Sequence, residues 1–264
     1  MNRMWIVAGL GLAVALAGCG GEGGSKDGAK KGSSGAGAKV DKDAKPWDPK
    51  AGTATIEGKV VFKGEPSRRR PVDMGSDPKC AAHHPEPMLD ESSIVGDGGG
   101  LQNVFVHVKS GLEKWTFTPP TEPAVLDQQG CAYRPHVLGV QEGQTLAVRN
   151  SDDVTHNVHA FAELNEGFNF SQATRGQEDG RKFELTEVPI KVKCDIHGWM
   201  SAYVAVVRHP FFAVTGPDGT FRLTGLPPGE YEIEAWHEIH GTQTAKVTVS
   251  DGAPSKVEFT FEED

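Results

Sequence analysis

Short runs of β-branched and alternating apolar residues, separated by turns rich in glycine and proline, fill the chain from residue 55 onward. The clearest turns are Gly-Pro-Asp-Gly at 216–219 and Gly-Leu-Pro-Pro-Gly at 225–229, because these residues either restrain φ or tolerate a positive φ. Few segments have the 3.6-residue periodicity of an amphipathic helix. The pattern predicts an all-β chain with very little helix, folded into sandwiches.

Two further features divide the chain into segments. Residues 64–100, rich in proline, glycine and charge, are expected to form an irregular excursion, and 183–188 are expected to contain a turn. The expected strands are 55–62, 104–108, 124–126, 136–140, 145–150, 157–161, 181–185, 190–194, 202–207, 211–214, 220–223, 231–236, 244–249 and 256–261.

The N-terminus has the features of an export signal. Arg3 precedes an apolar run at 5–17 that is too short to cross a bilayer. The run ends in Leu-Ala-Gly-Cys at 16–19, which resembles the bacterial lipobox; this implies a lipoprotein signal peptide at 1–19 and a lipid on Cys19. A plain signal peptide with an incidental cysteine is the alternative. Residues 20–52 are expected to be a disordered Gly/Ser/Lys tether.

This resemblance also implies a location. The protein is expected in the periplasm or at the cell surface, anchored to the membrane through Cys19. Gly20, where an aspartate would signal retention, favours the outer membrane. The formal net charge of -9 and the single basic block at 68–70 argue against nucleic-acid binding.

The heptapeptide 194–200, Cys-Asp-Ile-His-Gly-Trp-Met, places a thiolate, an imidazole and a thioether at three-residue intervals after a β-type run. Upstream, His156 and His159 lie an odd number of residues apart, so on a strand only one of them can enter a shared site. We expect it to be His156, with His159 as the alternative. A His2Cys set with a weak axial methionine is typical of a mononuclear blue-copper electron-transfer site. The expected ligands of one copper ion are His156, Cys194, His197 and Met200.

Three cysteines remain after Cys19 is assigned to the lipid, in a chain destined for an oxidising compartment. Because Cys194 lies in the His/Met cluster, we expect Cys80 to form a disulfide with Cys131. The alternative is a separate metal site, although no Cys-x-x-Cys spacing supports a zinc site. Its ligands would be Cys80, His83 and His84 with Cys131 or His136.

Residues 123–208 resemble the cupredoxins, of the plastocyanin and amicyanin kind. The resemblance rests on Tyr-Arg-Pro-His-Val-Leu-Gly-Val-Gln-Glu-Gly-Gln-Thr-Leu at 133–146, on Asn-Ser-Asp at 150–152 followed by His-Asn-Val-His, and on Cys-x-x-His-x-x-Met. It implies a Greek-key β-sandwich over 121–209, with Asn157 tying the two ligand loops together by hydrogen bonds. It also implies that His197 is the exposed edge through which electrons enter and leave. Trp199, beside the methionine, departs from the family pattern and bears on the docking surface.

Residues 211–261 resemble a carboxypeptidase-regulatory-like, or prealbumin-like, β-sandwich. The resemblance is carried by Ala-Val-Thr-Gly-Pro-Asp-Gly-Thr-Phe at 213–221 and Leu-Pro-Pro-Gly-Glu-Tyr at 226–231. Residues 210–264 supply too few strands for a sandwich, so 53–120 are expected to provide its first strands, with 121–209 inserted between. His237 and His240 are interpreted as ordinary strand-end histidines, with a metal site as the alternative.

The expected function is transfer of single electrons between a donor and an acceptor redox protein, for example a cytochrome or a copper oxidase. No enzyme is expected, because the His-x-His pairs of multicopper oxidases, Gly-x-Ser-x-Gly and His-Glu-x-x-His are all missing from the sequence. The alternatives are copper handling, and a structural lipoprotein whose second sandwich binds envelope polymer or protein. Acidic side chains near the expected site either steer a basic partner or serve solubility: Asp152, Asp153, Glu163, Glu166, Glu178 and Asp179.

Overall fold

The computed structural model of this chain describes residues 39–50 and 52–263. Backbone contacts divide the chain into residues 1–31 and 32–264. The expected signal peptide at 1–19, the lipidation site Cys19 and residues 20–38 of the expected tether lie outside the described residues. Among the described residues, no helix combines the length and hydropathy that a membrane span requires.

The chain is all-β, as the sequence predicts, with one short α-helix and one 3-10 helix among the described residues. In chain order the elements are β1 (Lys45–Pro46), β2 (Ala54–Lys63), α1 (Pro78–Ala82), η1 (Asp97–Gly99), β3 (Phe105–Ser110), β4 (Trp115–Thr116), β5 (Ala124–Gln128), β6 (Tyr133–Arg134), β7 (Val137–Gln141), β8 (Thr145–Asn150), β9 (His156–Phe161), β10 (Phe168–Gln172), β11 (Glu178–Lys182), β12 (Glu187–Lys193), β13 (Ser201–Val207), β14 (Phe212–Val214), β15 (Thr220–Leu226), β16 (Gly229–His237), β17 (Gly241–Val249) and β18 (Ser255–Glu262).

Strands β5 to β13 form the first sandwich. One sheet has the order β10-β9-β12-β13-β7 and the other β11-β8-β5-β6. Strands distant in sequence become neighbours, because β7 pairs in parallel with β13 and β5 in parallel with β8. Alternate residues point inward, and the core contains Leu126, Val148, Val158, Ile190 and Val204. The expected strand at 181–185 lies earlier, as β11, and β10 was not expected.

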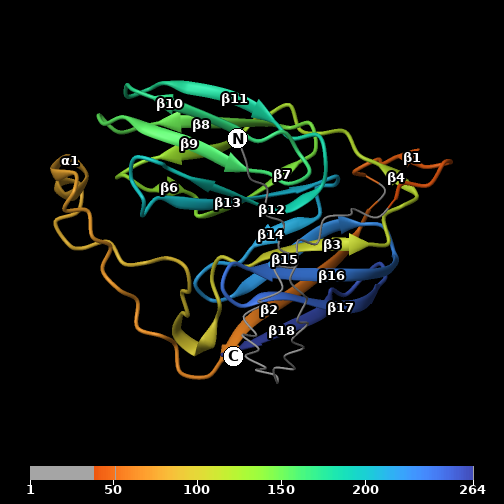
Figure 1. Cartoon of the computed structure of the whole chain (residues 1–264). Helices are drawn as coiled ribbons and strands as arrows, with labels where there is room; N and C mark the ends of the chain where they lie inside the picture. Colours follow the sequence, from red (N-terminus) through yellow and green to blue (C-terminus); the bar gives the residue numbers. More distant parts are fainter. Residues whose placement is uncertain (1–38, 51, 264) are drawn as a thin grey trace, which may run out of the picture. The chain divides into compact units, whose positions relative to one another are not determined.

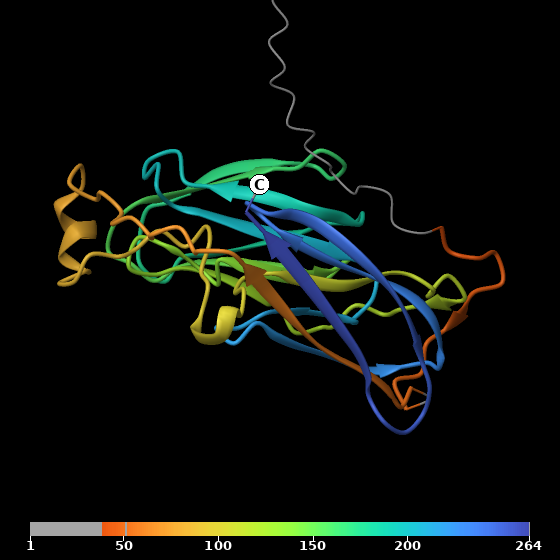
Figure 2. The same cartoon turned by 90° about the horizontal axis from the view of Figure 1, so that it is seen from below.

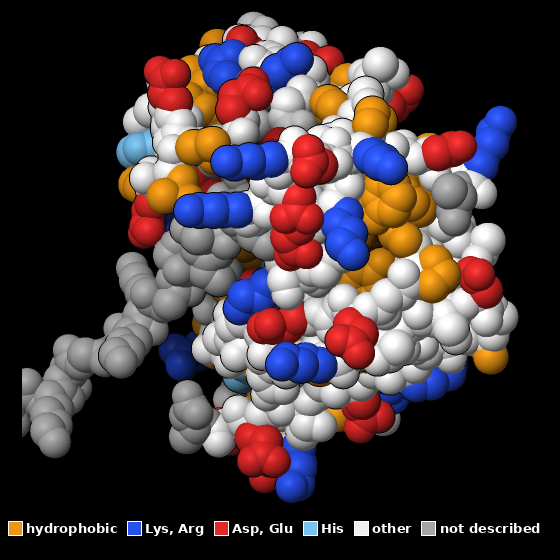
Figure 3. Space-filling model, turned by 90° about the vertical axis from the view of Figure 1, so that its right-hand side faces the viewer, with side chains coloured by type: hydrophobic (Ala, Val, Ile, Leu, Met, Phe, Trp, Pro, Cys, Tyr) orange, Lys and Arg blue, Asp and Glu red, His pale blue; other side chains and the backbone are white. Residues whose placement is uncertain are grey.

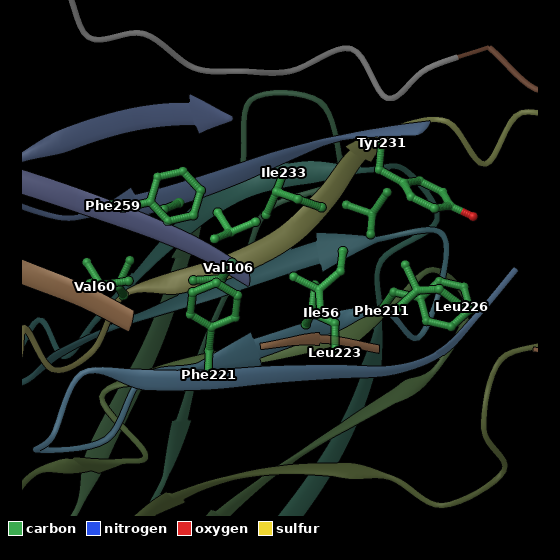
Figure 4. Close-up of a cluster of buried hydrophobic side chains, with 14 of the residues drawn as sticks. Ile56, Val60, Val106, Phe211, Phe221, Leu223, Leu226, Tyr231, Ile233 and Phe259 are labelled. Carbon is green, nitrogen blue, oxygen red and sulfur yellow. The ribbon is translucent and has the colours of Figure 1, made fainter. Parts of the chain in front are cut away.

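Strands β2, β3 and β14 to β18 form the second sandwich, from sheets ordered β14-β3-β16-β17 and β15-β2-β18. β2 pairs antiparallel with β15 and parallel with β18. The strands before the first sandwich therefore share sheets with the strands after it, and none of the β2 pairings runs to the first sandwich. Figure 4 shows the core between these two sheets, where Ile56, Val106, Phe221 and Phe259 point toward one another.

The two sandwiches meet through an apolar cluster. It includes Val137, Tyr203 and Val207 from the first sandwich and Phe105 and Trp236 from the second. Packing is close there, because a Cβ added at Gly139 would lie 2.3 Å from the ring of Phe212. A hydrogen bond between the side chains of His136 and Glu238 also links the sandwiches.

The last part of the expected tether is ordered. β1 pairs in parallel with β4, and the Trp47 ring lies 5.0 Å from the Trp115 ring at 70°. The expectation of disorder as far as residue 52 is therefore wrong for residues 39–50. The physical reason is Trp47, which buries apolar surface against the core of the second sandwich, as the preceding Gly/Ser/Lys tract cannot do.

The excursion at 64–100 contains more order than expected. It holds α1 and η1 and a bridge between Pro71 and Leu89. Asp77 caps α1, and Pro78 occupies the first turn, where a missing N–H is tolerated. α1 and β1 lie at opposite ends in both views (Figures 1 and 2). Although it lies far from residues 194–200 in the sequence, this excursion contacts them through Asp77 and Cys80, both of which approach His197.

Candidate metal centre

The side chains of His156, Cys194 and His197 converge at one end of the first sandwich. His156 opens β9, and Cys194 follows β12, which pairs with β9. The Nδ1 atoms of the two histidines lie 3.1 Å apart, and the Cys194 sulfur lies 3.7 Å from Nδ1 of His197. All three side chains are buried. The strand pairing thus brings together two ligand regions that are far apart in the sequence.

These spacings match those of donors that share one ion. A first-row metal such as zinc binds imidazole nitrogen at about 2.0 Å and thiolate sulfur at about 2.3 Å. At bond angles of roughly 105–120°, two such nitrogens would lie about 3.2–3.5 Å apart, and a nitrogen and a sulfur about 3.4–3.7 Å apart. The observed 3.1 and 3.7 Å are close to these values. The donor set fits a mononuclear metal ion with two imidazoles and one thiolate.

Two carboxylates decide which nitrogen of each imidazole faces the site. Nε2 of His156 lies 2.9 Å from Asp152 Oδ2, and Nε2 of His197 lies 3.2 Å from Asp77 Oδ2. A carboxylate only accepts, so each Nε2 carries the proton and donates it. Each Nδ1 is then left with its lone pair directed at the other. A shared proton or a cation between the two nitrogens relieves the repulsion of their lone pairs. Metal binding requires this tautomer, with the proton on Nε2 and the lone pair on Nδ1.

The surroundings of the Cys194 sulfur favour its thiolate form. Backbone N–H groups of Asn157 and His197 donate to it, each at 3.3 Å. Burial would raise the pKa of Cys194, but a hydrogen bond from His156 in its protonated form and those from these N–H groups hold it below the ordinary value. Burial would likewise lower the pKa of His156, but its bonds to Asp152 and Cys194 raise it. A thiolate beside imidazoles is the form that binds soft metal ions.

Met200 closes the ligand loop. Its backbone N–H donates to the His197 carbonyl at 2.9 Å, and its own carbonyl accepts from the Cys194 N–H at 3.2 Å. Its side chain is buried in the same apolar cluster as Cys194. The loop therefore folds back on itself, with the expected axial residue on the inner side of the sandwich.

Asn157 lies where the resemblance places it. Its Oδ1 accepts from the Asp195 N–H at 3.0 Å, and its Nδ2 donates to Asn169 Oδ1 at 2.6 Å and to the Phe170 carbonyl at 3.1 Å. One side chain thus joins the His156 region to the Cys194 loop and to β10. The neighbouring His159 points to the outer face and pairs with Asp195, so it does not approach the cluster.

His197 is not an exposed edge. Only 2% of this residue is accessible, because the excursion covers it: Asp77 accepts from Nε2, and the Cys80 sulfur lies 3.7 Å from the same nitrogen. Cys80 is disulfide-bonded to Cys131, which attaches α1 beside the ligand loop. The expectation of a solvent-facing imidazole is wrong, because nothing local in the heptapeptide reveals a cover that comes from another part of the chain.

The other metal sites considered from the sequence do not form among the described residues. His84 bonds to the Gly130 carbonyl, His83 lies near Asp153, and His136 bonds to Glu238. His237 accepts two backbone N–H groups at Nδ1. Burial, helped by the charge of His240, lowers its pKa to about 3. Within the described ranges, Cys80 and Cys131 each lie in a group of three metal-ligating side chains, but their sulfurs are bonded to each other, and no such group contains His83, His84, His136, His237 or His240.

The acidic residues near the site have different roles. Asp152 is buried and bonded to His156, so its interpretation as a steering or solubility charge is wrong, whereas Asp153 is exposed. Glu178 pairs with Arg149. On the face in Figure 3, acidic and basic side chains are interspersed rather than gathered by sign.

The sequence does not predict the hydrogen bonds that Asp152 and Asp77 make to the two histidines. A signal existed for Asp152, since it lies four residues before His156 and inside the resembling motif. For Asp77 the only signal was indirect: it lies three residues from Cys80, whose expected partner Cys131 is near the 133–146 motif. Trp199, which was noted as a departure, donates its indole N–H to the Cys131 carbonyl at 3.0 Å and stacks obliquely near His197.

Comparison with known families agrees with the resemblance of the C-terminal part. The family model of the carboxypeptidase regulatory-like domain matches residues 200–262. The match begins at β13, but that strand pairs with β7 and β12 of the first sandwich, so the sheet pairing places the return of the chain to the second sandwich after Val207. A search of curated proteins found no match.

The structural neighbours of the chain include cupredoxins. A mutant of amicyanin in the Cu(I) form is 23% identical, with 31% of this chain and 79% of that chain covered and a TM-score of 0.28. A purple cupredoxin from Nitrosopumilus maritimus is 28% identical, with 28% and 81% covered and a TM-score of 0.25. The copper-containing nitrite reductase from Thermus scotoductus is 20% identical, with 32% of this chain covered and a TM-score of 0.30; the chain spans 22% of its length.

Proposed function

We propose that the first sandwich binds one copper ion through His156, Cys194, His197 and Met200, and that the protein carries single electrons between redox partners. The observation that carries the proposal is the pair of Nδ1 atoms 3.1 Å apart beside a buried sulfur, with both Nε2 protons held by carboxylates. Copper bound there would supply the one-electron Cu(I)/Cu(II) couple.

The donor set favours copper over zinc. Thiolate and thioether suit the cuprous ion and imidazole suits the cupric ion, so one set of ligands serves both oxidation states. A structural zinc site has four strong Cys or His ligands, whereas the fourth donor here is a thioether. This choice rests on residue chemistry, and the assignment of the metal is part of the proposal.

The protein contributes a fixed arrangement of donors. His156 and Cys194 are held by paired strands, and Asn157 joins their loops. Ligands on rigid elements move little when the charge of the metal changes. A site of this kind needs no substrate pocket to exchange electrons, which is consistent with a carrier.

The test is to add Cu(II) to purified protein and record the visible spectrum. We expect an intense thiolate-to-copper band that bleaches with a one-electron reductant, returns on oxidation and is lost in Cys194→Ser. Ser93→Ala, a change away from the donors, is the matched control and should keep the band. A wild-type protein that stays colourless with Cu(II) would contradict the proposal.

Copper handling is the alternative function. The burial of His197 limits direct contact with an electron-transfer partner, but it limits ligand exchange with a copper acceptor as well. The two functions differ in what leaves the protein. A carrier exchanges electrons with a soluble redox protein while its copper content stays constant, whereas a copper-handling protein loses the ion to an acceptor chelator or protein. Stopped-flow measurement of both processes on the same sample separates them.

We also propose that the protein acts outside the cytoplasm, held to the membrane by a lipid on Cys19, and that its partners are redox proteins and not nucleic acid. The disulfide between Cys80 and Cys131 supports an oxidising compartment. Metabolic labelling with a palmitate analogue tests the anchor. Wild type should carry the label in the membrane fraction and Cys19→Ser should not; equal labelling of both would refute it.

A further inference from the structure

The carboxylate of Asp77 faces two ways. Its Oδ1 accepts from the backbone N–H groups of Lys79 at 2.9 Å and Cys80 at 3.3 Å, which caps α1. Its Oδ2 lies 3.2 Å from Nε2 of His197. The hydrogen bond from His197 is the main reason that the pKa of Asp77 lies below its ordinary value. This residue therefore joins the excursion to the ligand loop.

Asp152 accepts a hydrogen bond from His156, as Asp77 does from His197. Its two oxygens accept from the backbone N–H groups of Gly130 and Cys131, each at 2.8 Å, and from Nε2 of His156 at 2.9 Å. Burial would raise the pKa of Asp152, but these hydrogen bonds hold it below the ordinary value. Each histidine of the centre thus donates its Nε2 proton to a carboxylate, on the side of the ring opposite the shared site.

The disulfide between Cys80 and Cys131 connects the backbone groups that hold the carboxylates of Asp77 and Asp152. Cys131 donates its N–H to Asp152, and its sulfur is bonded to Cys80, whose N–H donates to Asp77. Both cysteines are fully buried. Because Asp77 begins α1 and Cys80 lies within it, movement of α1 away from the ligand loop would require this disulfide to break or the turn at 130–131 to shift.

We infer that Asp77 is a positioning residue of the metal centre, which holds the imidazole of His197 in its metal-binding tautomer as Asp152 holds that of His156. The α1 cap is then a working part of the centre. A carboxylate that accepts the outer N–H of a ligating histidine fixes the ring orientation and raises the basicity of the ligating nitrogen. This inference rests on the proposed metal-binding function and adds a residue to it from outside the first sandwich.

The test compares Asp77→Asn with wild type. Asparagine is also a good N-cap, so its side-chain oxygen can still cap α1, whereas its NH2 group cannot accept from Nε2. Asp153→Asn is the matched control: it removes a neighbouring acidic charge whose carboxylate faces His83 and none of the expected ligands. Asp77→Ser, which keeps a capping oxygen, is the second variant should Asp77→Asn fail to fold.

The first readout is Cu(II) affinity by competition with a chelator. We expect the dissociation constant of Asp77→Asn to rise by about 10- to 100-fold, with an upward shift of the reduction potential, because the lost anion stabilises Cu(II) more than Cu(I). Asp153→Asn should stay within about twofold of wild type. Equal effects of the two variants, or no effect of either, would overturn the inference.

The second readout uses the protein without metal. In wild type, nitrogen-15 NMR should find the His197 proton on Nε2, and in Asp77→Asn the tautomer population should shift toward Nδ1. A wild type with this tautomer that binds no copper would refute the proposed function alone. A variant whose tautomer is unchanged would refute the role of Asp77, whatever the metal.

Discussion

Removal of the disulfide should destabilise the metal-free protein substantially. The bond joins Cys80 to Cys131 across a sequence separation of 51 residues. In the chain-entropy account, a cross-link that closes a loop of that size reduces the conformational entropy of the unfolded chain and so raises its free energy by about 4 kcal/mol at 25 °C. Cys80→Ala/Cys131→Ala restores that freedom to the unfolded state, and the use of alanine leaves no unpaired hydroxyl in a fully buried position.

The assay is urea unfolding of the metal-free protein, followed by tryptophan fluorescence and by circular dichroism. Trp199 is a local probe, since its indole bonds to the Cys131 carbonyl. We expect the double variant to lose about 4 kcal/mol, seen as a lower midpoint, with a steeper slope because the cross-link no longer keeps the unfolded chain compact. Ala81→Ser, an exposed change in α1, is the control and should lose less than about 0.5 kcal/mol.

A loss below about 1 kcal/mol in the double variant would refute this reasoning. It would mean either that the unfolded chain already holds residues 80 and 131 close together or that α1 leaves the ligand loop at little cost. The two explanations separate in hydrogen exchange, because only the second predicts fast exchange of the Cys80 N–H in wild type.

Other changes have defined outcomes. Asn157→Ala removes the acceptor of the Asp195 N–H and should cost about 1–3 kcal/mol in urea unfolding, with faster loss of bound Cu(II) to a chelator; an unchanged rate would contradict its role. Gly139→Ala should cost about 1–3 kcal/mol through contact with the Phe212 ring, whereas a neutral result would mean that the sandwiches separate easily. Burial would raise the pKa of Glu187, but N–H groups at 163–165 lower it. Its stabilisation is therefore present above the unfolded pKa of about 4.3 and is lost as pH falls through the folded pKa, so wild type and Glu187→Gln should converge in unfolding midpoint toward acid pH.

Most strands of the fold could be predicted from the sequence, because alternating apolar residues and Gly/Pro turns are local patterns. Alternation and Gly/Pro turns mark β2, β16, β17 and β18, whose bounds lie within three residues of the expected strands. β10 was missed although Phe168 and Phe170 alternate with polar residues, since its five residues follow a glycine and a run of mixed character. α1 is too short for a periodic signal, yet Asp77-Pro78 carries the N-cap and first-turn proline that mark a helix start.

The candidate site could be predicted from the sequence only in part. The donors His156, Cys194 and His197 come from motifs, and the structure brings them together. The cover over His197 is a tertiary contact between residues 120 positions apart, which no periodicity or motif encodes. The carboxylate partners depend on how the excursion packs, and that packing depends on the disulfide and on burial rather than on local propensity.

The pairing of β2 with β18 has a consequence for synthesis of the chain. β2 emerges early but finds its parallel neighbour in the last strand and its other neighbour in β15, while β5 to β13 find theirs among themselves. On the ribosome, the inserted sandwich can complete both sheets while β2 still presents bare backbone N–H and C=O groups, the kind of edge that recruits foreign strands. A chain truncated before residue 255 would leave that edge open permanently, so premature termination should yield aggregates in which the first sandwich is already folded.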